Sequence, residues 1–231
     1  RHLGIHRHDQ FASLAHGRFR GTVATYKKTF ANLHNFDVLA GYESYNLKIQ
    51  ELQGSNTKIY NPTIGELNNA IASPPRVASF TNEYTTMGYL ARIQYDYDEK
   101  YFVSASYRRD ASSRFHPDNR WGNFGSVGLA WLINKENFMS NVSWIDMLKF
   151  KASYGIQGND NLGNYYAYAD QYSVTNSNGD FAVSFSYKGN KDITWETSYA
   201  FNTGFDFELL GNRLNGTVEY FNRKTVDLLY N

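Results

Sequence analysis

The chain has 231 residues, contains no cysteine and carries a formal net charge of +1. The lack of cysteine excludes disulfides and thiolate metal sites, and the near-neutral charge provides no bulk electrostatic attraction to nucleic acid. Tyrosine is unusually frequent, with 19 copies, and aromatic residues make up 17% of the chain. Such a composition is typical both of proteins at a membrane interface and of tyrosine-rich soluble β-sandwiches, so it does not choose between them.

The hydropathy pattern predicts no transmembrane helix, because no window of about 18 apolar residues occurs. The negative mean hydropathy of −0.57 is compatible with a membrane β-barrel, because an alternating strand averages its apolar and polar faces. The chain begins at Arg1 without a signal peptide and stops at Asn231 within a strand-like pattern. We therefore expect it to be a piece of a longer polypeptide.

Residues 1–16 are expected to form an exposed, irregular loop. The alternative is a metal site at His2, His6 and His8, whose spacing is short enough for shared ligation, although no acidic or thiol partner is fixed beside them. The loop is the preferred interpretation.

Two strands and a long loop are predicted for residues 17–82. Residues 17–30 alternate weakly and residues 35–45 alternate clearly, with a tight connection at residues 31–34. Residues 46–82 contain three of the chain's four prolines and several Asn and Gly residues. This composition predicts a loop, with one helical turn around residues 64–72.

The clearest strand signal lies in residues 84–133. Successive strand residues point to opposite faces, and residues 84–97 alternate accordingly. One face is mostly apolar: Thr85, Met87, Tyr89, Ala91, Ile93, Tyr95 and Tyr97. Residues 101–108 and 122–133 repeat the pattern, with a short charged turn at residues 98–100 and a longer charged loop at residues 109–120.

Three further strands are predicted by the same alternation, at residues 148–157, 195–207 and 214–220. The connections are residues 134–146 with a short helical turn, the long polar segment 158–192 with a strand extension such as 181–187, and a turn at 210–212.

About eight strands in four hairpins result, and short connections alternate strictly with long ones along the chain. Outer-membrane β-barrels show this asymmetry, because short turns face the periplasm and long loops face outside. The strands are long enough to cross a bilayer, which takes roughly 9–11 tilted residues. The predicted fold class is therefore all-β, an antiparallel transmembrane β-barrel segment.

A competing interpretation is a self-contained small β-barrel or a soluble β-sandwich that acts as a binding or adhesion module. Small residues on the polar faces, such as Gly88, Gly128, Gly155 and Gly204, favour a wide barrel that holds water or a plug. The mass of the intact polypeptide separates the two interpretations.

Several motifs also resemble one family. The run Arg108-Arg109-Asp110-Ala111-Ser112-Ser113-Arg114-Phe115, followed by Asn119-Arg120-Trp121-Gly122, resembles the RRDGSSRF…NRWG stretch of SusC/RagA-like TonB-dependent outer-membrane transporters. Other matches are Gly41-Tyr42-Glu43, Tyr95-Asp96-Tyr97, Leu148 to Gly155 with Gly158-Asn159, Ile193 to Thr197, and Asn212 to Leu229. The chain departs from the family at Ala111, where a glycine is usual.

This resemblance implies a section of a large, plugged barrel of about 22 strands in a Bacteroidetes-type bacterial outer membrane. It implies that residues 1–231 belong to one barrel domain, with the plug and the closing strands outside this chain. The implied partners are a SusD-like surface lipoprotein that covers the barrel, TonB through the N-terminal part, outer-membrane lipid, and an oligosaccharide or peptide cargo. The implied function is nutrient uptake.

No catalytic motif, cofactor site or paired-Cys metal site is found, so we expect neither an enzyme nor a cofactor. Cargo or lid contact is expected from planar hydrogen-bonding and aromatic side chains in the loops. These candidates are Arg109, Arg114, Phe115, Arg120, Trp121, Tyr60, Tyr165, Tyr166, Tyr168 and Tyr172.

A purely structural alternative, which is preferred for the charged motif, is a salt-bridge network of Arg109, Asp110, Arg114 and Asp118. Asn159-Asp160-Asn161 is read as a solvated turn rather than a calcium site. Aromatic residues near strand ends are expected to form a membrane-interface girdle. They are Tyr95, Tyr97, Tyr101, Trp131, Phe205 and Phe207.

Overall fold

The computed structural model describes residues 7–61, 63–70, 76–177 and 179–229. Its strands are β1 (Arg7–Phe30), β2 (His34–Thr57), β3 (Arg76–Tyr97), β4 (Tyr101–Ser112), β5 (Trp121–Leu132), β6 (Ile145–Asn159), β7 (Gln171–Ser177), β8 (Asp180–Tyr187), β9 (Glu196–Leu209) and β10 (Leu214–Val226). Three single-turn 3-10 helices are η1 (Leu67–Asn69), η2 (Ile133–Lys135) and η3 (Asn137–Met139).

Eight strands form one sheet in the order β1-β2-β3-β4-β5-β6-β9-β10, and β7 and β8 form a separate hairpin. Every pair from β3 to β10 whose register is described is antiparallel, which confirms the predicted all-β fold class. Over the described residues the sheet is open, because β1 and β10 stand at opposite ends of this order. The chain therefore does not form the closed eight-stranded barrel of the competing interpretation.

No helix in the ranges described above is both long and apolar enough to cross a membrane.

The chain divides into two units, residues 1–19 with 45–85, and residues 20–44 with 86–231. In the first unit, η1 confirms the predicted helical turn, and Tyr60 N–H donates to the carbonyl of Asn69 at 2.8 Å. The predicted loop at residues 46–82 is wrong at both ends, because β2 continues to Thr57 and β3 begins at Arg76. Backbone pairing with neighbouring strands continues these strands into stretches whose composition alone indicates a loop.

The predicted irregular segment at residues 1–16 is also wrong over its second part, because β1 begins at Arg7. His16 lies within this strand. The alternative metal site lies outside the described residues at His2 and His6.

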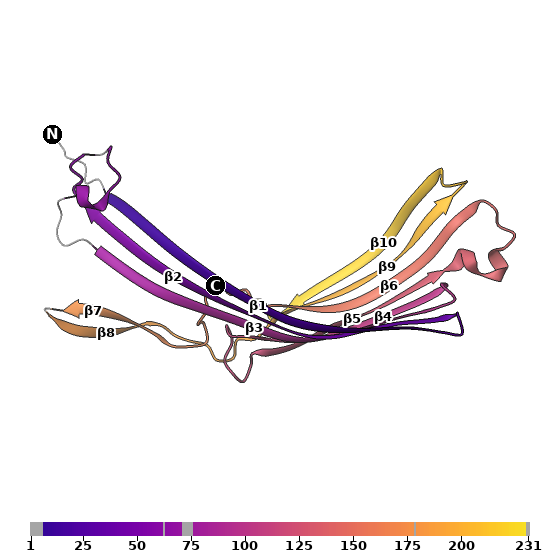
Figure 1. Ribbon diagram of the computed structural model, residues 1–231, viewed down its shortest axis with the longest axis horizontal. Coiled ribbons are helices and arrows are strands. Elements are labelled where there is room, and N and C mark those ends of the chain that lie inside the picture. Colours follow the sequence, from indigo (N-terminus) through magenta and orange to yellow (C-terminus); the bar gives the residue numbers. More distant parts are fainter. Residues whose placement is uncertain (1–6, 62, 71–75, 178, 230–231) are drawn as a thin grey trace. The chain divides into compact units, whose positions relative to one another are not determined.

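Tight turns join the strands of the second unit at the predicted places. Ala31 and Asn32 have φ angles of 50° and 56°, and Asp98 and Glu99 have 51° and 48°. Positive φ at both central residues is the type I′ hairpin turn, whose twist matches that of the flanking strands. Figure 1 shows β4, β5, β6, β9 and β10 as neighbouring ribbons of this unit.

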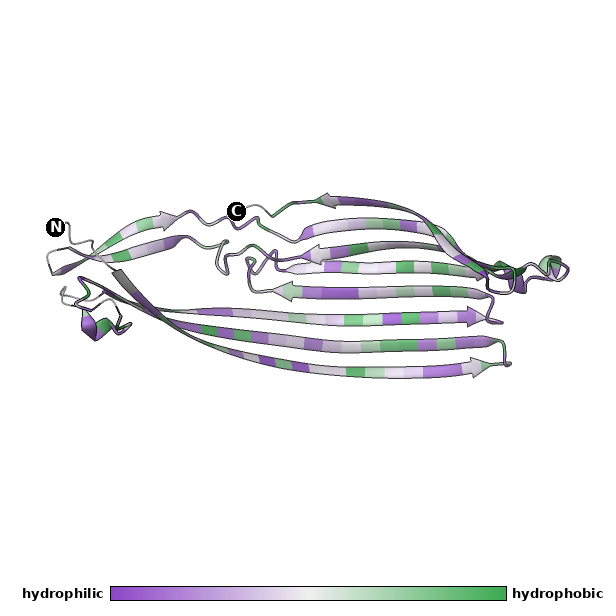
Figure 2. Cartoon of the chain, turned by 90° about the horizontal axis from the view of Figure 1, so that it is seen from above, coloured by the Kyte–Doolittle hydropathy of each residue, from purple (hydrophilic) through white to green (hydrophobic). Residues whose placement is uncertain are grey.

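The two faces of the sheet in the second unit follow directly from its register, because residues paired across strands share a face. One row crosses six strands and is mostly apolar: Tyr95, Val103, Leu129, Ala152, Thr203 and Tyr220. The adjacent row consists of polar residues and one glycine over five strands: Gln94, Ser104, Gly128, Ser153 and Asn202. We call these the apolar face and the polar face, and the banding along each strand in Figure 2 reflects them. The predicted alternation is confirmed.

Candidate binding site at the long connections

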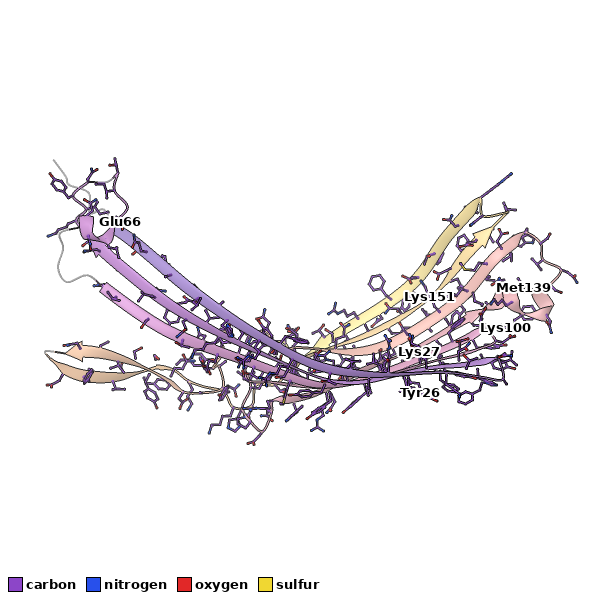
Figure 3. The ribbon with its side chains drawn as sticks, viewed as in Figure 1. Tyr26, Lys27, Glu66, Lys100, Met139 and Lys151 are labelled. Carbon is purple, nitrogen blue, oxygen red and sulfur yellow. The ribbon has the colours of Figure 1, made fainter. Side chains whose placement is uncertain are left out.

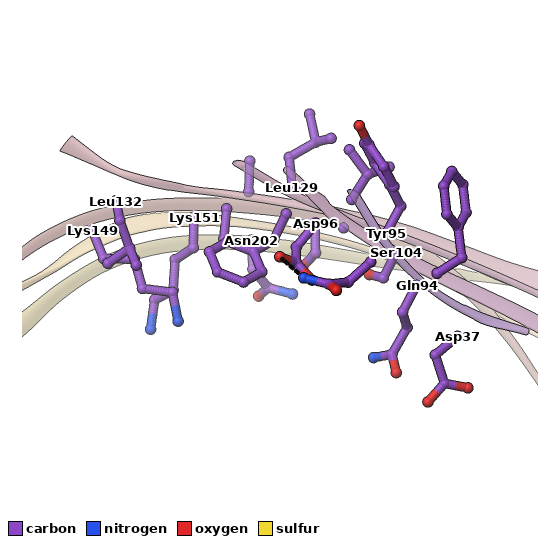
Figure 4. A pocket seen from close by; sticks show the side chains of 18 of the residues that line it. Asp37, Gln94, Tyr95, Asp96, Ser104, Leu129, Leu132, Lys149, Lys151 and Asn202 are labelled. Atoms are coloured by element: carbon purple, nitrogen blue, oxygen red, sulfur yellow. Dashed lines mark hydrogen bonds between the residues drawn. The ribbon is translucent and has the colours of Figure 1, made fainter. Parts of the chain in front are cut away.

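The polar face carries a groove of about 930 Å³ in the second unit. Lys27, Asp37, Lys151 and Glu219 are among its lining residues. Figure 4 shows Lys149, Lys151, Gln94 and Asp37 on one side of the ribbon, and Tyr95 and Leu129 on the other. The side chains of consecutive β1 residues also alternate between the two faces: Tyr26 and Lys27 lie on opposite sides of the strand (Figure 3).

Ion pairs across strands hold the charges of this groove. Lys151 Nζ lies 2.9 Å from Asp206 Oδ1 and 2.6 Å from Glu219 Oε1, so one cation bridges β6, β9 and β10. Lys27 Nζ lies 2.8 Å from Asp37 Oδ2 between β1 and β2. The groove thus carries paired charges on a lining that also includes apolar groups such as Phe102, Ala130 and Leu132.

Arg108 forms the first link of the predicted charged motif. Its Nε donates to both carboxylate oxygens of Asp110, at 2.9 and 2.7 Å, and its Nη2 donates to Glu43 of β2. Gly88 makes room for this cluster, because a Cβ there would lie 2.1 Å from Asp110 Oδ1. The structural alternative named the right kind of interaction but different partners, since Asp110 pairs with Arg108 rather than Arg109.

A second link joins the β4–β5 connection to the β6–β9 connection. Ser112 is fully buried, and its hydroxyl donates to Asp160 Oδ2 at 2.6 Å. Arg114 Nη1 donates to the carbonyl of Asp160 at 3.0 Å and to Asn161 Oδ1 at 3.1 Å. The oxygens of the Asn159-Asp160-Asn161 turn therefore accept protein hydrogen bonds that bind the two connections together.

An apolar cluster lies beside these hydrogen bonds. Phe115 is 0% exposed and its ring lies 5.4 Å from that of Trp195, which in turn lies 5.2 Å from Phe124. Leu162 and Ala167 complete the buried set. Trp195 Nε1 donates to the carbonyl of Arg120 at 2.9 Å, so its polar atom is satisfied within the protein. We call this set the loop-base cluster.

Two glycines admit the Phe124 ring into the loop-base cluster. A Cβ on Gly122 would lie 2.3 Å from this ring, and a Cβ on Gly158 would lie 2.1 Å from it. Both motif glycines are therefore required by close packing, and the base of the long connections is held as one packed unit.

The β7–β8 hairpin extends from this base and exposes one apolar side. Cross-strand pairing places Tyr172 opposite Phe185 and Val174 opposite Val183, with Phe181 further along the same side. All five are exposed, and Phe181 reaches 88%. The opposite side pairs Ser173 with Ser184 and Thr175 with Ala182. The sequence reading missed this surface, although Phe181, Val183 and Phe185 carry a period-two signal.

The ten predicted contact residues are distributed over several environments. Phe115 packs in the loop-base cluster and offers no surface, which corrects the expectation that it contacts cargo. Arg109 stacks over Trp121 at 5.2 Å, and Trp121 stacks on Tyr89 of the apolar face at 6.2 Å. Arg114 lies 5.2 Å from the Tyr165 ring, so these two candidates are brought together.

The other five candidates differ in exposure and partners. Tyr168 contacts His116 edge-on at 6.1 Å, Tyr166 and Tyr172 are exposed, and Arg120 Nε is buried without a hydrogen-bond partner among the described residues. Tyr60 is exposed in the first unit.

Aromatic side chains gather at the end of the apolar face that lies near the short turns. Tyr97, Tyr101 and Trp131 form a stacked series with successive ring centroids 6.3 Å apart. Tyr95 contacts Phe36 at 4.7 Å, and Phe205 contacts Phe150 at 5.2 Å. Phe207 shares the face through its pairing with Leu148. The residues proposed for a membrane-interface girdle are thus on one face.

Asp170 anchors the base of the β7–β8 hairpin. Its Oδ1 accepts the Gly189 N–H at 2.8 Å, and this hydrogen bond, aided by Lys188, lowers the pKa of the Asp170 carboxyl below its ordinary value. A depressed folded-state pKa stabilises the fold above the unfolded-state pKa, and that contribution is lost as the pH falls through the folded-state value.

The hydrogen bond at the hairpin base is therefore expected to weaken below about pH 4, where the pKa of an ordinary aspartate lies. Hydrogen exchange of the Gly189 amide, corrected for intrinsic rates, checks this in the full-length protein. Asp170→Asn should reduce the protection at neutral pH and remove its pH dependence, whereas Asp180→Asn, in the same hairpin, should change neither. An equally pH-dependent protection in Asp170→Asn would contradict the assignment.

Comparison with known proteins agrees with this architecture. Residues 4–231 match the family described as TonB dependent receptor-like, beta-barrel. TonB-dependent receptor P39 of Formosa agariphila is 36% identical over 217 residues, which cover 89% of this chain and 20% of that protein. TonB-dependent receptor SusC of Bacteroides thetaiotaomicron is 31% identical over 206 residues, which cover 85% of this chain and 20% of that protein.

A solved structure titled "Structure of the RagAB peptide transporter" superposes with a TM-score of 0.83 at 26% identity, covering 94% of this chain and 24% of that chain. The chain thus spans about a fifth of the length of the curated relatives it matches. These findings confirm the resemblance to SusC/RagA-like proteins, and the chain belongs to the TonB dependent receptor-like β-barrel family.

Proposed function

We propose that this chain is a section of the barrel wall of a SusC-like, TonB-dependent importer in a bacterial outer membrane. The observation that carries the proposal is the two-faced sheet of the second unit, whose mostly apolar and mostly polar rows cross at least five strands, in a chain of the β-barrel receptor family. An apolar face toward lipid and a polar face toward the lumen is the arrangement that a membrane barrel requires.

The rest of the receptor is proposed to come from the same, longer polypeptide. In this proposal residues 1–231 all belong to one barrel domain, and further strands pair with the edges of β1 and β10. The charge-balanced groove on the polar face, with Lys151 between Asp206 and Glu219, then faces the plug that fills the lumen. TonB would act through the N-terminal part, and the role of this section is transport rather than catalysis.

The long connections are proposed to contact cargo and a SusD-like surface lipoprotein. The exposed apolar side of the β7–β8 hairpin offers aromatic anchors, which dominate the energetics of protein interfaces. Hydrogen bonds from Gly189 to Asp170 and from Asn190 to Ala167 close the base of the hairpin, which reduces the ordering cost of binding. We assign this side of the hairpin to the lipoprotein lid.

Cargo contact is proposed for residues nearer the base of the hairpin. Arg114 and Tyr165 already pair, and Arg120 and Tyr168 lie in the connections beside them. Their guanidinium and phenol groups suit an oligosaccharide or a peptide. The solved neighbour is titled a peptide transporter and SusC is named a TonB-dependent receptor, and this chain is similar to both over most of its length.

The test uses the full-length receptor in its native outer membrane. The wild-type receptor should support TonB-dependent uptake and should co-purify with a surface lipoprotein. Phe181→Asp should lower the recovery of that lipoprotein about tenfold, equivalent to about 1.4 kcal/mol. The matched control, Thr175→Asp on the hydroxyl side of the same hairpin, should retain it. Equal recovery with both variants would move the lid contact elsewhere, and uptake without TonB would contradict the importer.

A further inference from the structure

The β5–β6 connection, residues 133–144, ends the apolar face at the short turns and is not a plain linker. It contains η2 and η3, and two of its large apolar side chains are exposed, Phe138 at 66% and Trp144 at 53%. Figure 2 colours part of this end of the chain as hydrophobic, between the end of β5 and the start of β6. The importer proposal leaves these side chains without a role.

The β9–β10 turn contributes to the same surface. Leu210 N–H donates to the carbonyl of Trp144 at 2.9 Å, which places the turn beside the connection. Leu210 is exposed, and so is Leu214, which pairs with Leu209 at the start of β10. We call Phe138, Trp144, Leu210 and Leu214 the apolar rim.

Hydrogen bonds hold the connection on the apolar side of the sheet. Glu136 accepts hydrogen bonds from the Tyr101 hydroxyl and, at 3.0 Å, from Trp131 Nε1. Both donors belong to the stacked aromatic series of the apolar face. The segment before Phe138 therefore lies over this face, and the rim continues the face beyond the ends of the strands (Lys100 and Met139 mark this end in Figure 3).

The charged groups around the rim are mostly hydrogen-bonded or paired within the protein. The carboxylates of Glu136 and Asp146 keep their negative charge while they accept hydrogen bonds, the latter from the Asn212 N–H at 3.0 Å, and Glu99 pairs with Lys135 at 2.9 Å. Arg213, next to Leu214, is exposed and has no ion pair among the described residues. Exposed aromatic and aliphatic groups beside a free cation are the features of a segment that lies in the headgroup region of a bilayer.

We propose that the apolar rim rests in the phospholipid leaflet at the short-turn side of the membrane, with Phe138 and Trp144 in the interface and Arg213 on lipid phosphate. This extends the lipid contact from the strands to a connection outside them, and it rests on the membrane placement proposed above. The rim then fixes how deeply the barrel wall sits at β5, β6, β9 and β10.

The experiment places an environment-sensitive fluorophore on single introduced cysteines, since this chain has none of its own. The full-length receptor is reconstituted in phosphatidylethanolamine and phosphatidylglycerol vesicles that contain lipid with a quencher near the headgroup or deep in the acyl chain. Phe138→Cys and Leu214→Cys report on the rim, and Val127→Cys reports on the apolar face in the middle of β5. Phe181→Cys, in the hairpin, is the water-exposed control.

If the rim lies in the interface, the shallow quencher should quench the Phe138 and Leu214 labels more strongly than the deep one. The deep quencher should quench the Val127 label more strongly, and neither quencher should affect the Phe181 label. If the Val127 label is quenched but both rim labels show water-like emission, the proposal that the apolar rim contacts lipid is wrong, while the importer proposal is unaffected. No quenching at Val127 would overturn the membrane placement, and the rim with it.

Discussion

Replacing Phe115 by alanine is expected to destabilise the loop end by about 3–5 kcal/mol, because it removes a fully buried ring from a small cluster. The ring contacts Trp195, and the same cluster holds Leu162 and Ala167 of the β6–β9 connection. Loss of the ring leaves a cavity that the hydrogen-bonded connections around Ser112 and Asp160 cannot close without breaking. We therefore expect local unfolding of residues 160–195 while the sheet persists.

Hydrogen exchange and limited proteolysis of the full-length receptor measure this effect, because local opening is resolved from global unfolding. Phe181→Ala is the matched control: it deletes the same type of side chain, from β8 within the β6–β9 connection, at a position that is almost fully exposed. Protection of residues 160–195 should fall in the first variant only. Unchanged protection in Phe115→Ala would show that the hydrogen bonds alone hold the loop base.

Replacing Val127 by arginine is expected to cost about 2–4 kcal/mol in the membrane-inserted receptor, because it places a charge on the lipid side of a barrel strand. Val127 is exposed on the apolar face and pairs with Ala105 and Tyr154. The receptor should reach the outer membrane in reduced amount and unfold at lower denaturant concentration, which heat-modifiability on gels and urea titration measure.

Ser153→Arg provides the control for the direction of the two faces. Ser153 is exposed on the polar face, pairs with Gly128 and Asn202, and lines the groove. An arginine there stays in a polar lumen and should change stability much less. Equal costs for the two substitutions, or the reverse order, would contradict the assignment of the apolar face to lipid.

Much of the sheet could be predicted from local signals. Alternation in residues 84–97 assigned Tyr89, Ile93 and Tyr95 to one face, and the register confirms it. The turn at Asp98 and Glu99 was found because short charged turns between alternating stretches are themselves local. The strand ends within residues 46–82 were missed, because the Asn, Gly and Pro residues of this segment outweighed the short alternation of Leu47 and Ile49 in β2.

The candidate site was less predictable, because its contacts join residues distant in sequence. The motif that contains Phe115 identified the family, but not that this ring is buried against Trp195, 80 positions later. Arg108 hydrogen-bonds to Glu43, which is 65 positions away in the sequence, and Ser112 hydrogen-bonds to Asp160, which is 48 positions away. The exposed side of the β7–β8 hairpin was likewise hidden within a segment that is polar on average.

By itself the sequence determined the fold class, the alternation of the two faces, the positions of the short turns and the family. These are consequences of a period of two and of short motifs, which residues within a few positions of one another decide. Only the tertiary structure decided which side chain closes the loop base, which charges pair and where apolar groups remain exposed. Those outcomes depend on strand register and on the packing of long connections, which bring Phe115, Asp160 and Trp195 together only when the whole sheet has formed.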